Sequence, residues 1–370
     1  MVGDLTPALR VAIERARVIA DTVLFPQAQQ TDTADLVPGG HLDALRHAGL
    51  NGLQGPEGLL GGLAADHGTA RLVFSAVAGG CGATAFVWAQ HHGAVRRLSG
   101  GDGPGRDRWL PSLCDGSLLA GIGFAYLRRP GPPAVRAVAS GSGWRLEGAA
   151  PWITGWGLAD LFVIMARADD GSVVTVVVDD PYERPELIPG PRQRLAVMGS
   201  TGTVSLRLDG LEIGEASVAG VQSAEAWERR DRIGSAMPSS APLGIAERAI
   251  DLLAGKGEAA PIAADAAVAF REELAQRQRG ADRMAGALTG VSDGGLEAAL
   301  DRGAIERDHG LDLARRTTDA LVAASGGGAM DLAHPAQRLS REATFFLIQA
   351  QTGSLRAASL RRLSRESPLP

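Results

Sequence analysis

The feature that most constrains how this chain folds is a change in the spacing of its apolar residues, which occurs twice. Up to about residue 118, apolar positions such as those from Leu9 to Val23 recur with a helical period. Short β-rich runs follow, and from about residue 223 long segments rich in Ala, Leu and Arg are helical again. The sequence therefore predicts a mainly α fold with a central β domain, divided into an α-helical domain over residues 1–118, a β domain over 119–222 and a C-terminal helical bundle over 223–370.

Glycine-rich breaks divide the C-terminal part of the chain into four long segments. We expect helices over residues 243–253, 263–287, 311–324 and 335–363. Long helices joined by short connections are typical of an antiparallel four-helix bundle. Because helices so rich in Ala and Leu also suit a subunit interface, we expect a homodimer or tetramer, and a hetero-oligomer remains open.

Composition and charge exclude several classes of protein. Hydrophobic residues make up 45% of the 370 residues and charged residues 21%, which excludes a disordered or fibrous chain. The net charge of −5 gives no overall basic excess for binding nucleic acid or a membrane surface. Cys81 and Cys114 are too few for a metal-site framework or a disulfide scaffold, and no segment has the pattern of a signal peptide or a membrane span. We therefore expect a cytoplasmic protein without a metal site.

Five short motifs follow one another along the chain: Trp152-Ile153-Thr154, Met198-Gly199, Gly244 to Asp251, Ser325 to Gly328, and Arg341-Glu342-Ala343. In this order they resemble the acyl-CoA dehydrogenase family over about residues 20–363. The resemblance implies the family's fold, with an N-terminal helical domain, a β domain and a C-terminal four-helix bundle. It also implies FAD as cofactor, an acyl-CoA or a related small molecule as substrate and, as a further option, an electron-transfer partner.

The Trp152–Thr154 motif also has the chemistry that a flavin requires. An isoalloxazine ring needs an aromatic or apolar wall, and a hydroxyl near its N5 atom tunes hydride acceptance. Trp152 and Thr154 are two positions apart, so on a strand they share one face. The alternatives remain open, since Trp152 also suits a β-domain core and a glycine run suits a plain helix stop. The resemblance assigns cofactor binding to Phe124, Ala125, Trp152, Ile153, Thr154, Gly326, Gly327 and Thr352.

The chain departs from the family pattern where the catalytic base is expected. Matching Arg341–Ala343 to the family's Arg-Asp-Ala helix places the base position, where the family has a glutamate that takes the substrate's α-proton, on Ala350. Some relatives carry the base elsewhere, at a position that falls near Gly234–Ser235 and also lacks a carboxylate. Alanine cannot accept a proton, so the base is absent or replaced, with the nearby acids Glu228 and Asp231 as candidate stand-ins.

A second departure concerns the segment that covers the flavin and the thioester in the family. It corresponds here to Gly123–Tyr126 and Arg128–Gly131. Tyr126 and Arg128 are candidates for binding an anionic substrate, because a guanidinium and a phenol donate hydrogen bonds to oxyanions. The alternative is a solvated loop with an exposed arginine pair.

Three functions are compatible with these residues. The first is α,β-desaturation of an acyl thioester by a flavin-dependent dehydrogenase with a non-standard or absent base. The second is a flavin monooxygenase of the same fold, which needs no base for an α-proton, and the third is a non-catalytic subunit of a dehydrogenase complex. The missing carboxylate favours the second and third, whereas the Trp152–Thr154 motif favours the first two. We expect the first, a flavin-dependent oxidoreductase resembling acyl-CoA dehydrogenases.

Overall fold

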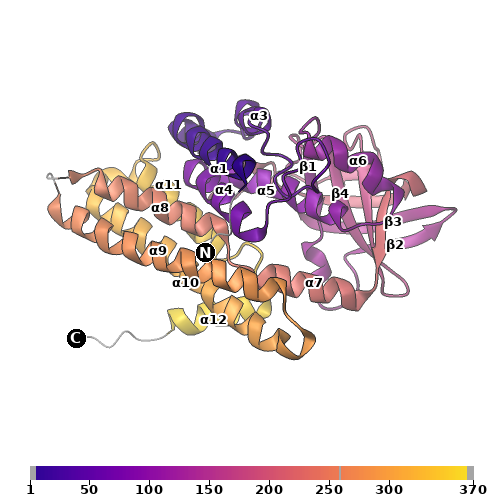
Figure 1. The fold of residues 1–370 in the computed structure, drawn as a ribbon. Helices are drawn as coiled ribbons and strands as arrows, with labels where there is room; N and C mark the ends of the chain where they lie inside the picture. Colours follow the sequence, from indigo (N-terminus) through magenta and orange to yellow (C-terminus); the bar gives the residue numbers. More distant parts are fainter. Residues whose placement is uncertain (1–5, 258–259, 365–370) are drawn as a thin grey trace. The chain divides into compact units, whose positions relative to one another are not determined.

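The computed structural model describes residues 6–257 and 260–364 of the chain (Figure 1). These residues divide into two compact units, each described here by itself. The β-containing unit comprises residues 6–66 and Ala83–Glu228, and the bundle unit comprises His67–Gly82 and the described residues from Arg229 onward. The division into three domains at residues 118 and 222 stays a prediction, although every described strand lies between Ala120 and Gln222.

The β-containing unit surrounds one sheet with helices from the first third of the chain. Its helices are α1 (Pro7–Ile19), α2 (Phe25–Thr33), α3 (Gly39–His47), α5 (Gly82–Ser99) and α6 (Pro104–Cys114). Its strands are β1 (Ala120–Gly123), β2 (Val135–Ser140), β3 (Gly143–Ile153), β4 (Leu161–Ala168), β5 (Val173–Asp179), β6 (Leu187–Pro189), β7 (Val204–Ile213) and β8 (Val218–Gln222). The β-rich runs in the sequence are therefore confirmed as strands, and β1, β2, β6 and β8 add shorter ones.

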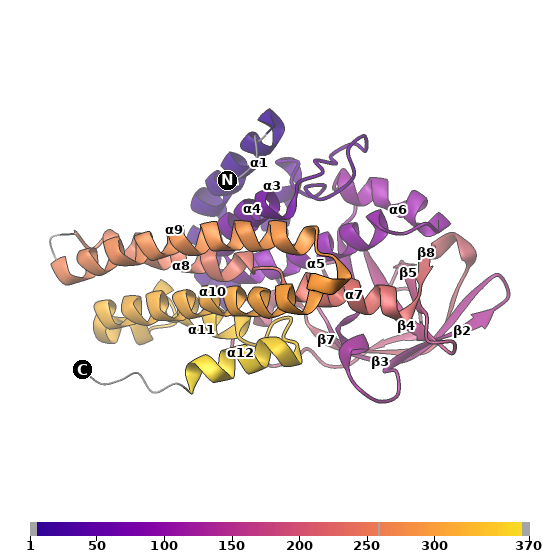
Figure 2. The ribbon, with the colours of Figure 1, turned by 60° about the horizontal axis from the view of Figure 1, so that its bottom comes forward.

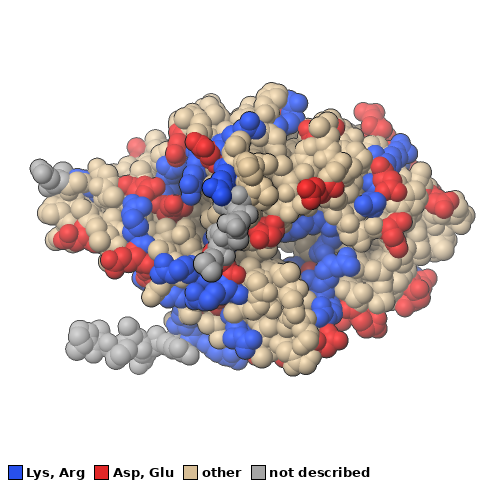
Figure 3. All heavy atoms as spheres, viewed as in Figure 1, with Lys and Arg blue, Asp and Glu red and all other residues tan. Residues whose placement is uncertain are grey.

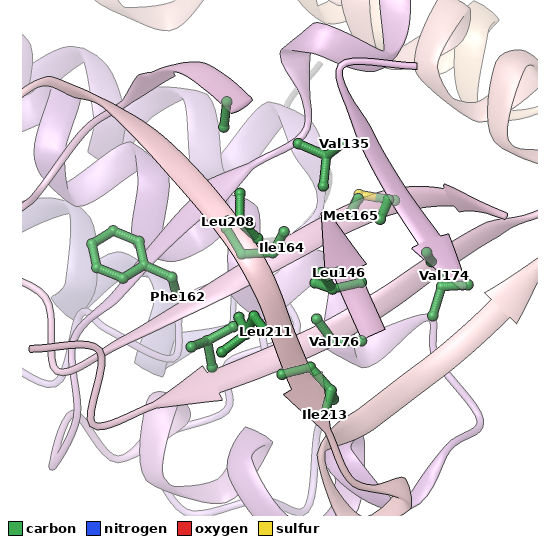
Figure 4. Close-up of a cluster of buried hydrophobic side chains, with 14 of the residues drawn as sticks. Val135, Leu146, Phe162, Ile164, Met165, Val174, Val176, Leu208, Leu211 and Ile213 are labelled. Carbon is green, nitrogen blue, oxygen red and sulfur yellow. The ribbon is translucent and has the colours of Figure 1, made fainter. Parts of the chain in front are cut away.

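The described strands form one mixed sheet in the order β6-β7-β3-β2-β4-β5-β8, with β1 paired to β4. Only the pairs β1–β4 and β2–β4 are parallel among the described ladders. Apolar side chains from β2, β3, β4, β5 and β7 gather into one cluster, in which Leu146, Phe162 and Leu211 are fully buried (Figure 4). The strand β4 is buried along nearly its whole length, which explains its continuous apolar sequence.

The bundle unit packs long helices against one another. Its helices are α4 (His67–Gly80), α8 (Ser240–Ala254), α9 (Pro261–Thr289), α10 (Leu296–Ser325), α11 (Pro335–Phe346) and α12 (Gly353–Leu363), while α7 (Ala224–Ala236) contains the division between the units. Figure 2 shows α9 and α10 side by side along their length. The helix expected over residues 311–324 starts earlier, at Leu296, directly after the turn at Asp293–Gly295, because Gly303 and Gly310 are buried within the helix and do not break it.

The single helix expected over residues 335–363 is wrong. The helix α11 ends at Phe346, a turn follows, and α12 begins at Gly353 with the Thr352 hydroxyl as its N-cap, which accepts a hydrogen bond from the amide of Leu355 at 3.4 Å. Ala350 in this turn has a φ of 52°, a left-handed conformation that no helix tolerates. The turn therefore leaves the Arg341–Ala343 motif on α11 and places Ala350, the expected base position, between α11 and α12.

Charged side chains of both signs are mixed over much of the molecular face in Figure 3. Within the bundle unit, Arg316 bridges Asp312 on its own helix at 2.7 Å and Glu273 on α9 at 2.6 Å. No described helix has the length and apolar character needed to span a membrane. No group of three or more His, Cys, Asp or Glu side chains among the described residues could hold a metal ion.

The helices α4 and α8 cross at a point where only glycine fits. A β-carbon placed on Gly244 would lie 1.9 Å from the carbonyl oxygen of Ser75, and one on Gly79 would lie 2.8 Å from the carbonyl oxygen of Gly244. The crossing is further held by the Ser75 hydroxyl, which donates to the Ser240 carbonyl at 2.9 Å. The start of the motif from Gly244 to Asp251 thus has a packing role in the bundle.

We expect Gly244→Ala to lower the free energy of unfolding by about 1–3 kcal/mol or more, because the added methyl group overlaps backbone that cannot move away. Gly286→Ala is the matched control. It lies within α9 with open space around its α-carbon, so we expect a gain of about 0.5–1 kcal/mol from helix propensity. Urea denaturation of both variants measures the difference, and equal stabilities would contradict the close crossing.

His91 on α5 is buried as a neutral side chain whose tautomer is set by its partners. Its Nδ1 atom accepts a hydrogen bond from the Ala120 amide at 3.2 Å, so Nε2 carries the proton that faces the Asn51 carbonyl at 3.1 Å. Burial lowers the pKa of His91 to about 4. Burial also lowers the pKa of the adjacent His92 well below its ordinary value, and the two rings contact each other edge to face.

These histidines should make the fold sensitive to acid. Between pH 6.5 and about 4, His91 is neutral in the folded protein but protonated in the unfolded chain, so the folded protein binds fewer protons. The contribution of His91 to the free energy of unfolding is therefore complete above pH 6.5 and is lost as the pH falls through this window. The contribution of His91 is on the order of 3 kcal/mol. Urea denaturation at several pH values should show a shallower pH dependence for His91→Gln than for the wild type. The exposed His47 is the control, and an unchanged slope in His91→Gln would contradict the assignment.

Candidate functional site

The Trp152–Thr154 motif lies at the end of strand β3. Ile153 is fully buried in the sheet core, and the alternation along the strand turns Trp152 away from it. Trp152 is 51% exposed, the highest exposure of a tryptophan among the described residues. Thr154, which was expected to share a strand face with Trp152, lies just past the end of β3 and is buried at 6% exposure. The motif therefore combines an accessible indole with a nearly enclosed hydroxyl.

Thr154 belongs to a chain of hydroxyl groups. Its Oγ1 atom lies 3.0 Å from Oγ1 of Thr203, which in turn lies 2.8 Å from Oγ1 of Thr201. The Thr201 hydroxyl donates to the carbonyl oxygen of Met198 at 2.7 Å. All three threonines are buried. The hydroxyl chain is a buried polar element in the loops just beyond the end of β3 and just before the start of β7.

Backbone pairing explains why these hydroxyls meet. The strands β3 and β7 are antiparallel, with Ile153 opposite Val204, and the amide of Gly155 donates to the Thr201 carbonyl at 2.9 Å. Gly202 has a φ of 61°, and a β-carbon on it would lie 2.4 Å from the carbonyl oxygen of Trp156. Glycine at this position lets the two loops lie against each other.

The segment after β1 lies beside the same motif. A β-carbon placed on Gly121 would lie 3.1 Å from the Thr154 carbonyl oxygen, and one on Gly123 would lie 2.6 Å from Cδ1 of Ile153. Phe124 follows directly and is partly buried against the sheet core, while Ala125 is exposed. The structure thus brings together two segments that the sequence analysis assigned separately to the cofactor.

The two residues predicted to bind substrate occupy different environments. The Tyr126 hydroxyl is buried and lies 2.7 Å from the Met165 carbonyl oxygen and 2.9 Å from that of Gly123. Burial raises the pKa of Tyr126 far above its ordinary value. Arg128 is partly exposed and its guanidinium carbon lies 5.2 Å from the centre of the Phe124 ring, while Arg97 on α5 lies 5.0 Å from the same ring. Tyr126 therefore orders this segment, and Arg128 is the better placed of the two for an anionic ligand.

The remaining cofactor candidates lie in the bundle unit. Gly326 and Gly327 form the start of a short 3-10 turn after α10, are exposed and have open space around their α-carbons. Thr352 caps α12, so its hydroxyl already accepts from Leu355 and lies 3.1 Å from Oγ of Ser354. Glu342 of the Arg-Glu-Ala motif is buried and accepts hydrogen bonds from Arg338 at 2.7 Å and from the Gly82 amide at 3.3 Å. That carboxylate stabilises the bundle.

The two positions at which a base was sought meet at one arginine. Arg307 on α10 is 6% exposed, and its guanidinium donates to the Ser235 carbonyl at 3.2 Å and to the Gln349 carbonyl at 2.9 Å. The backbone before Ala350 and the end of α7 are therefore held by the same side chain. Asp231 is buried on α7, one turn before Ser235, whereas Glu228 is exposed.

Sequence reasoning missed Arg307, Thr201 and Thr203. Nothing in the local sequence of α10 distinguishes Arg307 from the other arginines, since its role depends on two carbonyls distant in the chain. The Thr-Gly-Thr pattern at residues 201–203 precedes a strand and could have marked a tight turn. Its pairing with Thr154 follows only from the sheet topology.

Comparisons with known proteins agree with this architecture. The family model described as "Acyl-CoA dehydrogenase, N-terminal domain" matches residues 6–117. The chain is 28% identical over 280 residues to the 3-sulfinopropanoyl-CoA desulfinase of Paraburkholderia xenovorans, in an alignment that covers 67% of each protein. It is 26% identical over 266 residues to the human mitochondrial short-chain specific acyl-CoA dehydrogenase, where the alignment covers 67% of this chain and 62% of the human protein, which is less than two thirds.

Solved structures resemble the whole described chain. Butyryl-CoA dehydrogenase from Megasphaera elsdenii matches with a TM-score of 0.79 at 18% identity, covering 99% of this chain and 100% of that one. Dibenzothiophene monooxygenase from Paenibacillus sp. A11-2 matches with a TM-score of 0.77 at 17% identity, covering 97% of each chain. The predicted mainly α fold with a central β domain is confirmed, and it is the acyl-CoA dehydrogenase-like class of fold. The family model and the relatives support the resemblance of this chain to the acyl-CoA dehydrogenase family.

Proposed function

We propose that this protein is an acyl-CoA dehydrogenase-type flavoprotein that binds FAD against the Trp152–Thr154 motif and takes an acyl thioester as substrate. The observation that carries the proposal is the half-exposed Trp152 indole two positions before the enclosed Thr154 hydroxyl, with Phe124 and Ala125 in the adjacent segment. An aromatic wall with one oriented polar atom is the surface that an isoalloxazine ring requires. Bound there, the flavin would supply a hydride acceptor.

The residues of the chain would divide the remaining tasks. Trp152 and Phe124 would exclude water from the ring, and Ile153 would contribute through its backbone, since its side chain belongs to the core. Gly326, Gly327 and the start of α12 at Thr352 would lie along the dinucleotide, where exposed amides suit phosphate oxygens. Arg128 would bind an anionic part of the substrate.

The absence of a carboxylate at Ala350 and at Gly234–Ser235 favours a second candidate function. A flavin monooxygenase requires no α-proton base, and the fold occurs in the dibenzothiophene monooxygenase. The desulfinase relative is named for removal of a sulfur group instead of dehydrogenation. Desaturation by a relocated base, with Asp231 as its candidate, remains our first proposal. The third alternative, a non-catalytic subunit, would be excluded by flavin-dependent turnover of any substrate.

We further propose that the protein is a cytoplasmic homodimer or tetramer, with a hetero-oligomer or an electron-transfer partner as the alternatives. Exposed apolar side chains on two bundle helices support this assembly. They are Ile262 and Val268 on α9, at 84% and 63% exposure, and Leu360 and Leu363 on α12, at 58% and 59%.

The visible spectrum of the purified protein tests flavin binding, and Trp152→Ala tests the site. Loss of the indole should weaken FAD binding about threefold to tenfold, since an aromatic stacking contact is worth about 0.5–1.5 kcal/mol. Trp144→Ala is the control, because Trp144 lies on the same strand at its other end and packs against the sheet core. Equal FAD dissociation constants for Trp152→Ala and the wild type would remove Trp152 from the site.

Stopped-flow bleaching of the flavin by a panel of acyl-CoAs tests the missing base. Wild-type bleaching should be slow, and Ala350→Glu should accelerate it by up to about 10²–10⁴-fold, the usual contribution of a positioned base. Ala350→Gln is the control, since it has nearly the same size as glutamate but cannot accept the proton. Both variants keep a side chain in the left-handed conformation that Ala350 already adopts.

Rapid bleaching by the wild type would show that another residue abstracts the proton, and loss of that rate in Asp231→Asn would identify it. The panel should include 3-sulfinopropanoyl-CoA, with release of the sulfur group as its readout, because of the named relative. Bleaching by reductant alone, followed by oxygenation of an added aromatic substrate, would support the monooxygenase instead.

A further inference from the structure

The hydroxyl chain from Thr154 to Met198 has a fixed direction. A carbonyl oxygen only accepts hydrogen bonds, so the Thr201 proton points at Met198, 2.7 Å away. Because a hydroxyl carries a single proton, the 2.8 Å contact between Thr201 and Thr203 is made by the Thr203 proton. The 3.0 Å contact between Thr203 and Thr154 is then made by the Thr154 proton. The three hydroxyl protons therefore all point along the series from Thr154 towards the Met198 carbonyl.

This direction determines what Thr154 presents to a ligand. Its only proton is committed to Thr203, so towards a bound molecule Oγ1 offers a lone pair and nothing else. A group that donates an N–H or O–H is stabilised there. A group that itself presents a lone pair meets an oxygen that cannot donate, unless every hydroxyl of the chain reverses. Reversal would set a lone pair of the Thr201 hydroxyl against the Met198 carbonyl oxygen 2.7 Å away, which would then accept only from the Thr201 amide at 3.2 Å.

An isoalloxazine ring changes its hydrogen-bonding character in a way that matches this property. The oxidised ring carries a lone pair at N5 and an N–H only at N3. Addition of two electrons and one proton, equivalent to a hydride from the substrate, places a hydrogen on N5. An acceptor-only hydroxyl at N5 therefore binds the reduced ring better than the oxidised ring, whereas one at N3 binds both equally.

We propose that Thr201 and Thr203 are positioning residues that hold Thr154 as a hydrogen-bond acceptor for the N5–H group of the reduced flavin. The inference rests on the proposed function, because it requires the flavin to lie against the Trp152–Thr154 motif. Its consequence is a higher reduction potential, which eases transfer of the hydride from the substrate. The potential is therefore set by two threonines behind the one that faces the flavin.

The test is the midpoint potential of the bound flavin, measured by spectroelectrochemistry. In Thr203→Val the Thr154 proton loses its acceptor and is released to donate to N5 of the oxidised ring. The preference for the reduced over the oxidised form should fall about threefold to tenfold, as one hydrogen bond changes. For a two-electron couple this lowers the midpoint potential by about 14–30 mV. Thr203→Ser keeps the hydroxyl and should leave the potential unchanged.

Two further variants keep the test decisive. Thr201→Val does not touch Thr154, yet it lets the Thr203 proton turn towards Thr154, so it should lower the potential in the same direction. In a Thr154→Val background, Thr203→Val should produce no further shift, which separates the positioning role from general disturbance of the sheet. A shift of the same size in that background would overturn the inference.

The outcomes also separate this inference from the proposed function. Bound flavin whose potential does not change in Thr203→Val or Thr201→Val overturns the inference alone. Purified wild-type protein that binds no FAD after incubation with excess cofactor overturns the proposed function, and the inference with it. A downward shift in both valine variants, with none in Thr203→Ser, supports both.

Discussion

The antiparallel pairing of β3 with β7 is the interaction on which the candidate site depends. It sets Ile153 opposite Val204, and the backbone bonds that continue past the strand ends bring residues 154–156 against residues 201–203. The register decides which side chains face the core, since a shift by one residue would exchange the sides of Trp152 and Ile153. The exposed indole and the hydroxyl chain are both consequences of this one register.

The turn that contains Ala350 is positioned by a side chain and not by strand pairing. In the bundle unit, the buried guanidinium of Arg307 holds the carbonyls of Ser235 and Gln349, so the end of α7 and the turn before Ala350 are fixed together. Hydrogen bonds from a charged donor to backbone carbonyls define geometry more strictly than apolar packing does. A side chain at Ala350 would consequently project from a turn that Arg307 holds in place, so under the proposed function a glutamate or an alanine there would differ in chemistry and not in fold.

Much of the fold could be predicted from the sequence because it depends on local patterns. The apolar spacing identified the β-rich runs and the long helices, and the motif order indicated the resemblance to acyl-CoA dehydrogenases and hence their fold. The break between α11 and α12 could not be predicted, because residues 347–352 contain neither glycine nor proline and the turn depends on contacts such as that of Arg307 with Gln349. Thr203 was missed for a related reason. Its role depends on a partner 49 positions away that only the sheet register supplies.

The features that would govern reactivity belong to separate compact units. The hydroxyl chain lies in the β-containing unit, and the base positions lie in the bundle unit. Under the proposed function, a hydroxyl that only accepts hydrogen bonds would favour the reduced flavin whatever delivers the electrons, whereas the group at position 350 would decide which substrates can deliver them. One chain could therefore keep its control of the flavin while its substrate chemistry changed. On this proposal, alanine at position 350 signifies altered substrate chemistry and not a degraded dehydrogenase.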